Sequence, residues 1–184
     1  MRTPPAPDNE QQRLWALIAT GLLDRAAEDR FDRITRTASR LFDVPIALIG
    51  LIDQDREWLL SSVGLPLRQL PREVSFCAHT ILADNTLVVA DASADARFCH
   101  NPLVVDDPCI RFYAGHALRN EEGHAYGTLG LFDRAPRDFS EDDCAALRDL
   151  AHVAENEIGR GVPGTAAALS HGKVSAHTGA LSPG

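Results

Sequence analysis

The sequence of 184 residues is poor in basic charge and contains a single lysine, Lys173. Its 26 acidic residues outnumber 18 basic ones, which gives a net charge of −8. Proteins that bind nucleic acid or anionic lipid present a basic surface, so neither is expected as a partner. No apolar run approaches the roughly 20 residues that span a bilayer, and no signal peptide follows Met1. We therefore expect a cytoplasmic protein.

Motifs of the common enzyme classes are also lacking. The chain has no glycine-rich phosphate loop, no Gly-x-Ser-x-Gly and no His-Glu-x-x-His, so the usual kinase and hydrolase sites are not indicated. In a reducing compartment the four cysteines are expected to be free thiols. Cys99, His100, Cys109 and His116 include no closely spaced pair of the kind that zinc sites use, so no metal is predicted.

Glycine and charge are unevenly distributed along the chain. Residues 159–184 contain six of the 13 glycines but no aromatic and no acidic residue, and residues 1–8 contain three prolines. Segments of this kind bury too little apolar surface to offset their conformational entropy. We predict a disordered lead over 1–8, one domain over 9–158, and a disordered tail or linker over 159–184. All 17 arginines and all 26 acidic residues lie at or before position 160, so that part carries −9.

The order of the apolar patterns predicts the fold class α+β. Short polar turns join neighbouring strands, which makes them antiparallel, and amphipathic helices precede and follow them. Ser140, with Asp143 three residues later, forms a capping box at the start of the last helix. The expected helices cover 9–20, 27–42, 77–83 and 141–158, and the expected strands cover 46–52, 58–63, 87–90, 111–118 and 125–132.

The strands at 46–52 and 125–132 consist almost wholly of apolar residues and glycine. This pattern indicates that both faces of the sheet are covered. We expect the terminal helices on one face, and the short helix with the irregular segment 91–108 on the other. Loops packed over a sheet commonly enclose a small-molecule cavity. The alternative is that these loops close the core and leave no usable cavity.

Several short motifs follow one another along residues 9–158. They are Gly21-Leu-Leu-Asp24, Phe31-Asp32, Val44-Pro-Ile-Ala47, Arg72-Glu-Val-Ser-Phe-Cys-Ala-His-Thr-Ile81, Asp95-Ala-Arg-Phe98, Asn101-Pro-Leu-Val104, Ile110-Arg-Phe-Tyr-Ala-Gly115 and Gly127-Thr-Leu-Gly-Leu-Phe-Asp133, with Pro136 and Arg137 after the last. These motifs resemble the GAF domain family, in the branch found in bacterial signalling proteins such as sensor histidine kinases and diguanylate cyclases.

The resemblance implies both a fold and a function. The fold is a central antiparallel sheet of five or six strands, with helices on one face and a ligand pocket under loops and short helices on the other. The function is that of a regulatory domain that senses an unidentified small molecule without being an enzyme. Such a domain passes its signal to a kinase or cyclase output domain, in cis or in trans. The cofactor, if any, is left open.

Candidate ligand-binding residues follow from this pocket. They are Cys77, His79, Asp91, Phe98, Cys109, Arg111 and Tyr113. Each has a structural alternative: Cys77 as a small buried hydrophobe, His79 as an imidazole bonded to a neighbouring loop, and Arg111 as an ion pair with Asp91 or Asp107. Strand alternation places Tyr113 on the face opposite to Phe112, and the sequence leaves open which face meets the pocket.

Other activities of GAF relatives give alternative hypotheses. The Asn-Lys pair of cyclic nucleotide sites is absent, because no lysine precedes Lys173. Cys99 and His100 form a pair like that of bilin-binding relatives, but the residues around them differ. A thiol redox enzyme of the free methionine sulfoxide reductase type would need Cys77, Cys99 and Cys109 close together. It would consume methionine sulfoxide and lose this activity in Cys77→Ser or Cys109→Ser.

The last helix predicts a homodimer. Its apolar face ends near Arg160, where a signalling linker would begin, and paired terminal helices are a usual dimer surface for such modules. Leu147, Leu150 and Ile158 would then lie at the interface. Their alternative role is packing against the sheet. A pure dimerisation module with a filled core therefore stays open as a third function.

Overall fold

The computed structural model describes residues 1–161 and contains one six-stranded antiparallel sheet in the order β3-β2-β1-β6-β5-β4. In chain order the elements are α1 (Glu10–Ala19), α2 (Asp29–Leu41), β1 (Ile46–Ile52), β2 (Arg56–Val63), β3 (Gln69–Pro71), the 3-10 turn η1 (Arg72–Val74), α3 (Cys77–Thr80), β4 (Leu87–Val89), α4 (Pro102–Val105), β5 (Phe112–Arg119), β6 (Ala125–Asp133) and α5 (Glu141–Gly159). The predicted α+β class is confirmed.

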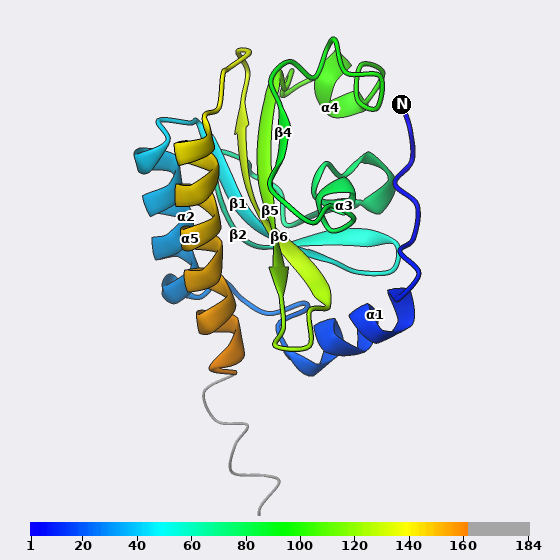
Figure 1. The fold of residues 1–184 in the computed structure, drawn as a ribbon, viewed down its shortest axis with the longest axis vertical. Coiled ribbons are helices and arrows are strands. Elements are labelled where there is room, and N and C mark those ends of the chain that lie inside the picture. The colour runs from blue at the N-terminus through cyan, green and yellow to red at the C-terminus, as the bar shows by residue number, and fades with distance from the viewer. Residues whose placement is uncertain (162–184) are drawn as a thin grey trace, which may run out of the picture.

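The sheet is covered on both faces (Figure 1). Helices α2 and α5 lie side by side on one face. The opposite face is covered by η1, α3, α4 and the loops that join them, which we call the covering layer. Helix α1 lies apart from α2 and α5, across the end of the sheet. Within residues 1–161, no helix is long and apolar enough to cross a membrane.

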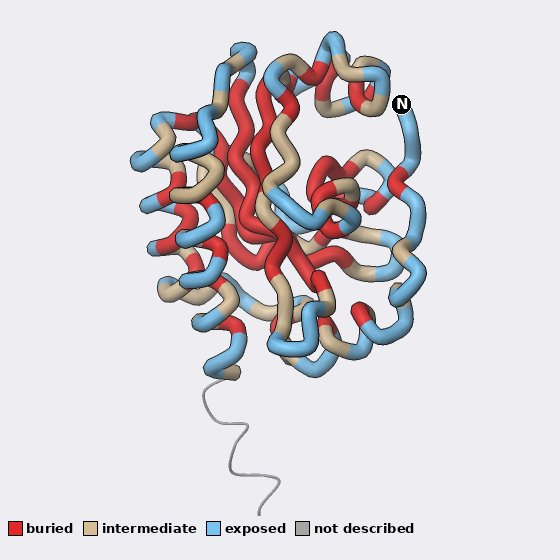
Figure 2. Tube along the Cα trace, in the orientation of Figure 1, coloured by how far each residue is buried: buried red, intermediate tan, exposed pale blue. Residues whose placement is uncertain are grey.

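The sheet separates two apolar cores. Alternate residues of each strand point to opposite sides, so that Phe112 of β5 packs toward α2 and α5 while Tyr113 packs toward the covering layer. Strands β1 and β6 are buried at every position, and Figure 2 shows the central strands buried along their length. The double cover predicted from their apolar sequences is thus present.

Sequence periodicity missed two short elements. Strand β3 ends at Pro71, and proline lacks the N–H that a central strand needs, but β3 is an edge strand where this is tolerated. Helix α4 is a single turn in the segment expected to be irregular, started by Asn101, whose side chain accepts a hydrogen bond from the Leu103 N–H. Helical periodicity would place Ile18 and Leu41 on the apolar sides of the first two helices, but both side chains are exposed. Each lies near the end of its helix, beyond the reach of the core.

Residues 1–8 were predicted to be a disordered lead, and the structure instead places them against the covering layer. The Arg2 N–H donates to the Arg97 carbonyl over 3.0 Å, and Pro4 is buried. Proline rings pack well in an extended segment, because such a segment needs few backbone hydrogen bonds. Of the predicted tail, residues 162–184 lie outside the described residues.

Helix α5 begins as its sequence predicts. The Ser140 hydroxyl accepts from the Asp143 N–H over 3.1 Å, and the Asp143 carboxylate accepts from the Ser140 N–H over 2.9 Å, which completes the capping box. Leu147 and Ile158 are buried against the sheet. Both were expected at a dimer interface, and the structure shows that their surfaces are already used inside the domain.

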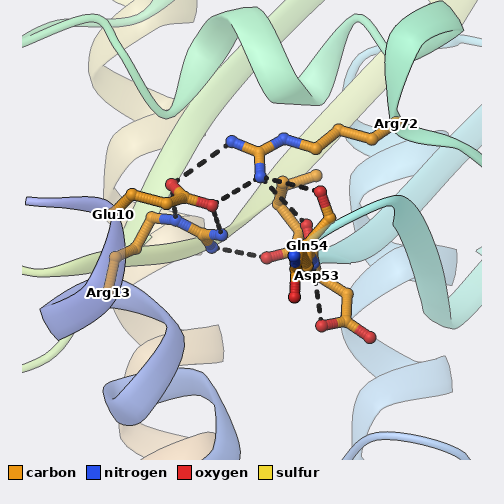
Figure 3. A network of polar contacts seen from close by, with 6 residues as sticks. Glu10, Arg13, Asp53, Gln54 and Arg72 are labelled. Atoms are coloured by element: carbon orange, nitrogen blue, oxygen red, sulfur yellow. Dashed lines mark hydrogen bonds and ion pairs between the residues drawn. The ribbon is translucent and has the colours of Figure 1, made fainter. Parts of the chain in front are cut away.

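Helix α1 is fastened by a buried polar network (Figure 3). Arg13 is 1% exposed, donates to the Ile52 carbonyl, and pairs with Glu10 over 2.7 Å. Arg72 of η1 pairs with the same carboxylate over 2.5 Å and donates to the carbonyls of Asp53 and Gln54. Burial alone would raise the pKa of Glu10, but hydrogen bonds from the two arginines outweigh it and lower the pKa to about 2.

The Glu10→Gln variant is expected to lose about 1–2 kcal/mol of unfolding free energy at pH 7, since its side chain is one-fifth exposed and water competes for the pair. Because the pKa is lower in the folded chain, the wild-type contribution is present above the usual value of 4.5 and is lost as the pH falls toward 2. Urea unfolding at pH 7 and pH 3 measures both effects. The exposed Glu73→Gln is the control, and an equal loss in both variants would contradict a special role for Glu10.

Candidate functional site

The candidate site lies between the sheet and the covering layer, where buried polar side chains gather. Glu57 of β2 is 2% exposed, and Ser75, between η1 and α3, is 1% exposed. The Ser75 hydroxyl donates to Glu57 Oε2 over 2.5 Å and accepts from the Ala78 N–H over 2.9 Å. Ser75 therefore caps the start of α3 and at the same time donates to the Glu57 carboxylate.

The second oxygen of Glu57 lies over β1. Glu57 Oε1 has no hydrogen-bond partner among the described residues. A Cβ placed on Gly50 would come within 1.9 Å of this oxygen, so only glycine leaves room for the carboxylate there. Burial raises the pKa of Glu57, and the Ser75 hydroxyl, which donates to Oε2, and the nearby Cys77 thiol oppose this shift only in part. Among the described residues, therefore, Oε2 of Glu57 has a hydrogen-bond donor and Oε1 has none.

Next to Glu57, a thiol and a phenol share the same buried space. The Tyr113 hydroxyl hydrogen-bonds the Thr80 hydroxyl over 2.5 Å and lies 3.6 Å from the Cys77 sulfur. Burial raises the pKa of Cys77 and of Tyr113 well above their usual values. Both groups are therefore neutral at physiological pH. They act as packing and hydrogen-bonding groups at the floor of the covering layer.

An aromatic cluster fills the centre of this layer. The Phe76 and Phe98 rings stack with centroids 4.1 Å apart, and Phe76 also contacts Tyr113 and Phe132 at 5.2 and 5.8 Å. The His79 ring meets the Phe98 edge at 4.9 Å. The region in which the sequence predicted a pocket is thus largely occupied by side chains.

A small cavity persists beside the aromatic cluster, above β1 and β2. Its volume is about 20 Å³, enough for about one water molecule. Glu57 is the only ionisable residue that lines it. The other lining residues are apolar: Ile46, Leu48, Leu65, Leu67, Leu70, Phe76, Leu103, Pro108, Ile110 and Phe132. Leu67 is 41% exposed and Leu103 is half-buried, so these two side chains mark the side nearest to solvent.

The structure brings together three of the seven predicted site residues. Cys77, Phe98 and Tyr113 are fully buried within the covering-layer core. His79 lies at the outer side of this group, where its Nε2 contacts the Arg2 carbonyl at 3.1 Å. Burial lowers the pKa of His79, so its imidazole is neutral near pH 7.

The remaining three predicted residues lie outside this group. Asp91 closes a turn by accepting from the N–H and hydroxyl of Ser93, and Cys109 is exposed. The alternative role of Arg111, an ion pair with Asp91 or Asp107, is not formed within residues 1–161, although the Arg111 charge, after the hydrogen bonds from Ser93, helps to lower the pKa of Asp91. The Arg111 guanidinium instead donates to the carbonyls of Val104 and Ile110, which tie α4 to the start of β5.

Sequence reasoning missed Glu57, because the strand was expected to begin at Trp58. Strand β2 begins at Arg56, and alternation then puts Glu57 on the same face as Leu59, toward the covering layer. An acidic residue at an inward position of a buried strand is the signal that would have identified it. Within residues 1–161, no three His, Cys, Asp or Glu side chains are grouped in a way that could hold a metal ion.

Comparison with known proteins identifies the fold. A family model described as GAF domain matches residues 26–158. The chain belongs to the GAF domain family. The match begins after α1 (Glu10–Ala19) and ends within α5.

One curated relative and two solved structures show how far the likeness extends. A cyclic di-GMP phosphodiesterase from Pseudomonas aeruginosa is 44% identical over 154 residues, which are 83% of this chain. The chain spans only 26% of that relative's length. The GAF domain of an Acinetobacter phosphoenolpyruvate-protein phosphotransferase superposes with a TM-score of 0.59 at 18% identity, covering 84% of this chain and 95% of that one.

A free methionine-R-sulfoxide reductase from Neisseria meningitidis, solved with its substrate, superposes on this GAF domain with a TM-score of 0.58. Its identity is 18%, and the alignment covers 87% of this chain and 97% of the reductase. Identities this low establish the shared fold and nothing about the chemistry. The activity of this GAF domain has to be argued from its own residues.

Proposed function

We propose that this GAF domain is a sensory module that binds a small molecule between the sheet and the covering layer. The structural change caused by binding is transmitted to α5. The observation that carries the proposal is the cavity beside Glu57, which is bordered on the side nearest to solvent by Leu67, in the loop before β3, and by Leu103 of α4. A ligand larger than the cavity would enter by displacing Leu67 and Leu103. Binding would therefore order or shift the covering layer.

Strand β5 provides the route to α5. Tyr113 of β5 belongs to the covering-layer core, while its neighbours Phe112 and Ala114 belong to the core under α2 and α5. Further along the strand, the Arg119 N–H donates to Glu155 of α5 over 2.7 Å. A shift of β5 therefore also moves α5, the last helix within residues 1–161. The 44% sequence identity with part of a cyclic di-GMP phosphodiesterase supports a signalling enzyme as the receiver of this signal, either on the same chain or on a separate one.

Binding is favoured over thiol catalysis by the state of Cys77. A redox cysteine reacts as the thiolate, whereas burial raises the pKa of this thiol well above its usual value. Cys109 is exposed and Cys77 is buried. We therefore place the sensor ahead of a methionine sulfoxide reductase, and the absence of sulfoxide turnover is the expected result.

Thermal unfolding tests the sensor directly. Purified full-length chain is screened against small alcohols, amines, amides and carboxylates, and at least one compound is expected to raise the melting temperature by several degrees. A ligand at 100 times its Kd adds about 2.7 kcal/mol of stability. Leu103→Trp, which fills the cavity mouth, is expected to abolish the shift.

The matched control is Val105→Trp, because Val105 lies on the same short helix but is 57% exposed. It should keep the ligand response of the wild type. A screen in which no compound of any class stabilises the wild-type protein would contradict the sensor and favour a filled-core dimerisation module.

We also propose a homodimer, now through α1 in place of the buried face of α5. Trp15 and Ile18 are three residues apart on α1 and are 63% and 64% exposed, so they form one apolar patch on the helix surface. Light scattering at micromolar concentration is expected to show a dimer, and the double variant Trp15→Glu, Ile18→Glu a monomer. Val105→Glu is the control. A 20 kDa species alone for the wild type would contradict the dimer.

A further inference from the structure

The unpartnered oxygen of Glu57 sets a chemical requirement on any ligand of the cavity. Glu57 is 2% exposed, it lines the cavity, and its Oε1 has no hydrogen-bond partner among the described residues. A buried carboxylate that lacks a partner is strongly unfavourable. A ligand in the cavity that donates a hydrogen bond to Oε1 would remove this cost.

The protein offers no positive charge to Glu57. The titratable neighbours that influence it are the Cys77 thiol from α3 and the Tyr113 phenol from β5, and both become negative if they ionise. No arginine or histidine of residues 1–161 forms an ion pair with it. The charge of the carboxylate is thus left for a ligand to neutralise.

A water molecule is a poor occupant of this position. A buried water normally makes about three hydrogen bonds, and every other side chain that lines the cavity is apolar. A primary ammonium group fits poorly for the same reason, since it carries three N–H donors. The lining suits a cation with one N–H directed at Oε1 and carbon atoms on its remaining sides.

We propose that this site recognises a small protonated tertiary amine, whose single N–H⁺ donates to Glu57 Oε1 while its alkyl groups contact the leucine and isoleucine side chains around it. This inference rests on the proposed sensory function and specifies the ligand class. The nitrogen atom of the ligand occupies the existing cavity, and its alkyl groups displace the side chains of Leu67 and Leu103 toward solvent. The ion pair forms in an apolar environment, where it is strong only if both partners are fully satisfied.

Three probes of nearly the same shape separate the contributions to binding. Trimethylammonium has the charge and one N–H, tetramethylammonium has the charge without a donor, and tert-butanol has a donor without the charge. Titration calorimetry on the full chain is expected to rank trimethylammonium first, with each of the other two weaker by about tenfold or more. Equal affinity for all three, or preference for an anion such as acetate, would overturn the inference.

Proton release gives a test that needs no variant. Because burial raises the pKa of Glu57, the titrations are carried out over a series of pH values above 4.5, and a cation that binds the ionised carboxylate expels a proton wherever the free protein still holds one. The binding enthalpy of trimethylammonium should therefore differ between phosphate and Tris buffers by the number of protons released multiplied by the difference between the ionisation heats of the two buffers. Tetramethylammonium, if it binds elsewhere on the acidic surface, should show no such difference. Identical enthalpies for trimethylammonium in both buffers would overturn the proposal.

Glu57→Gln is the matching variant. It keeps the shape and removes the charge, so it should lose affinity for trimethylammonium about tenfold or more and retain its weak affinity for tert-butanol. If the variant binds trimethylammonium as well as the wild type, Glu57 is not the recognition group. Binding of neutral or anionic compounds alone would sink the amine site and leave the sensor standing, whereas binding of no compound at all would sink both.

Discussion

Replacing Phe76 by alanine is expected to lower the free energy of unfolding by about 3–5 kcal/mol. The Phe76 side chain is 1% exposed and touches three aromatic rings of the covering-layer core, stacking on Phe98. Its removal forfeits both the transfer free energy of a benzyl group and the contacts of the rings around it. Because the stack joins α3 to the segment that carries α4, the whole layer should loosen. Urea denaturation at pH 7 measures the loss.

A matched variant on the other face separates this effect from a general loss of aromatic packing. Phe139 contacts Phe42 and Phe112 at 5.5 Å but is only partly buried, so Phe139→Ala should cost about half as much or less. Phe76 also lines the existing cavity, and an enlarged apolar cavity binds small aromatic molecules. Benzene is therefore expected to stabilise Phe76→Ala but neither Phe139→Ala nor the wild type. A loss below about 1 kcal/mol for Phe76→Ala would show that the covering layer is not packed as described.

The fold could be predicted from the sequence because local patterns and tertiary burial agree over most of it. The strand of residues 46–52 is apolar throughout and lies at the centre of the sheet with both faces covered, and Ser140 starts α5 with the predicted capping box. The sequence pattern gave wrong burial at positions where contacts with distant residues determine whether a side chain is buried. Arg13 lies on the apolar side of α1 yet is 1% exposed, and only a carboxylate on its own helix and a carbonyl 39 residues away make that burial possible.

The candidate site was predicted less well, for a related reason. Cys77, Phe98 and Tyr113 were recognised and do come together. Arg111 was paired with the wrong partners, because sequence separation says little about which carbonyls a guanidinium reaches. Glu57 was missed altogether, and its environment depends on the absence of a side chain at Gly50. The register partner of Glu57 is Ile52, and Gly50 lies two residues further along the neighbouring strand. Local periodicity does not reveal that a glycine at this diagonal position leaves room for a carboxylate.

Glu57→Met is expected to raise the free energy of unfolding by about 1–3 kcal/mol at pH 8. Methionine carries no charge and is larger than glutamate by about one methyl group, so it can occupy the space over Gly50 and extend into the small cavity beside it. The substitution removes an acceptor from the Ser75 hydroxyl, which costs about 1 kcal/mol and is included in that range. Natural proteins retain a destabilising residue where function requires it, and ligand binding is the function proposed for Glu57.

The pH dependence of this gain distinguishes charge from packing. The pKa of Glu57 is raised in the folded chain, so the folded state holds the proton more tightly than the unfolded state does. The wild-type protein is therefore most stable, as far as this group is concerned, below the usual value of 4.5, and loses stability as the pH rises from there toward the raised pKa. The advantage of Glu57→Met should grow over that range and shrink as the pH is lowered to 4.5. The exposed Glu122→Met should change stability by less than about 0.5 kcal/mol at either pH. A gain that is the same at pH 4.5 and pH 8 would mean that folding does not raise the pKa of Glu57 and that packing alone explains the gain, and it would remove the electrostatic argument for a cationic ligand.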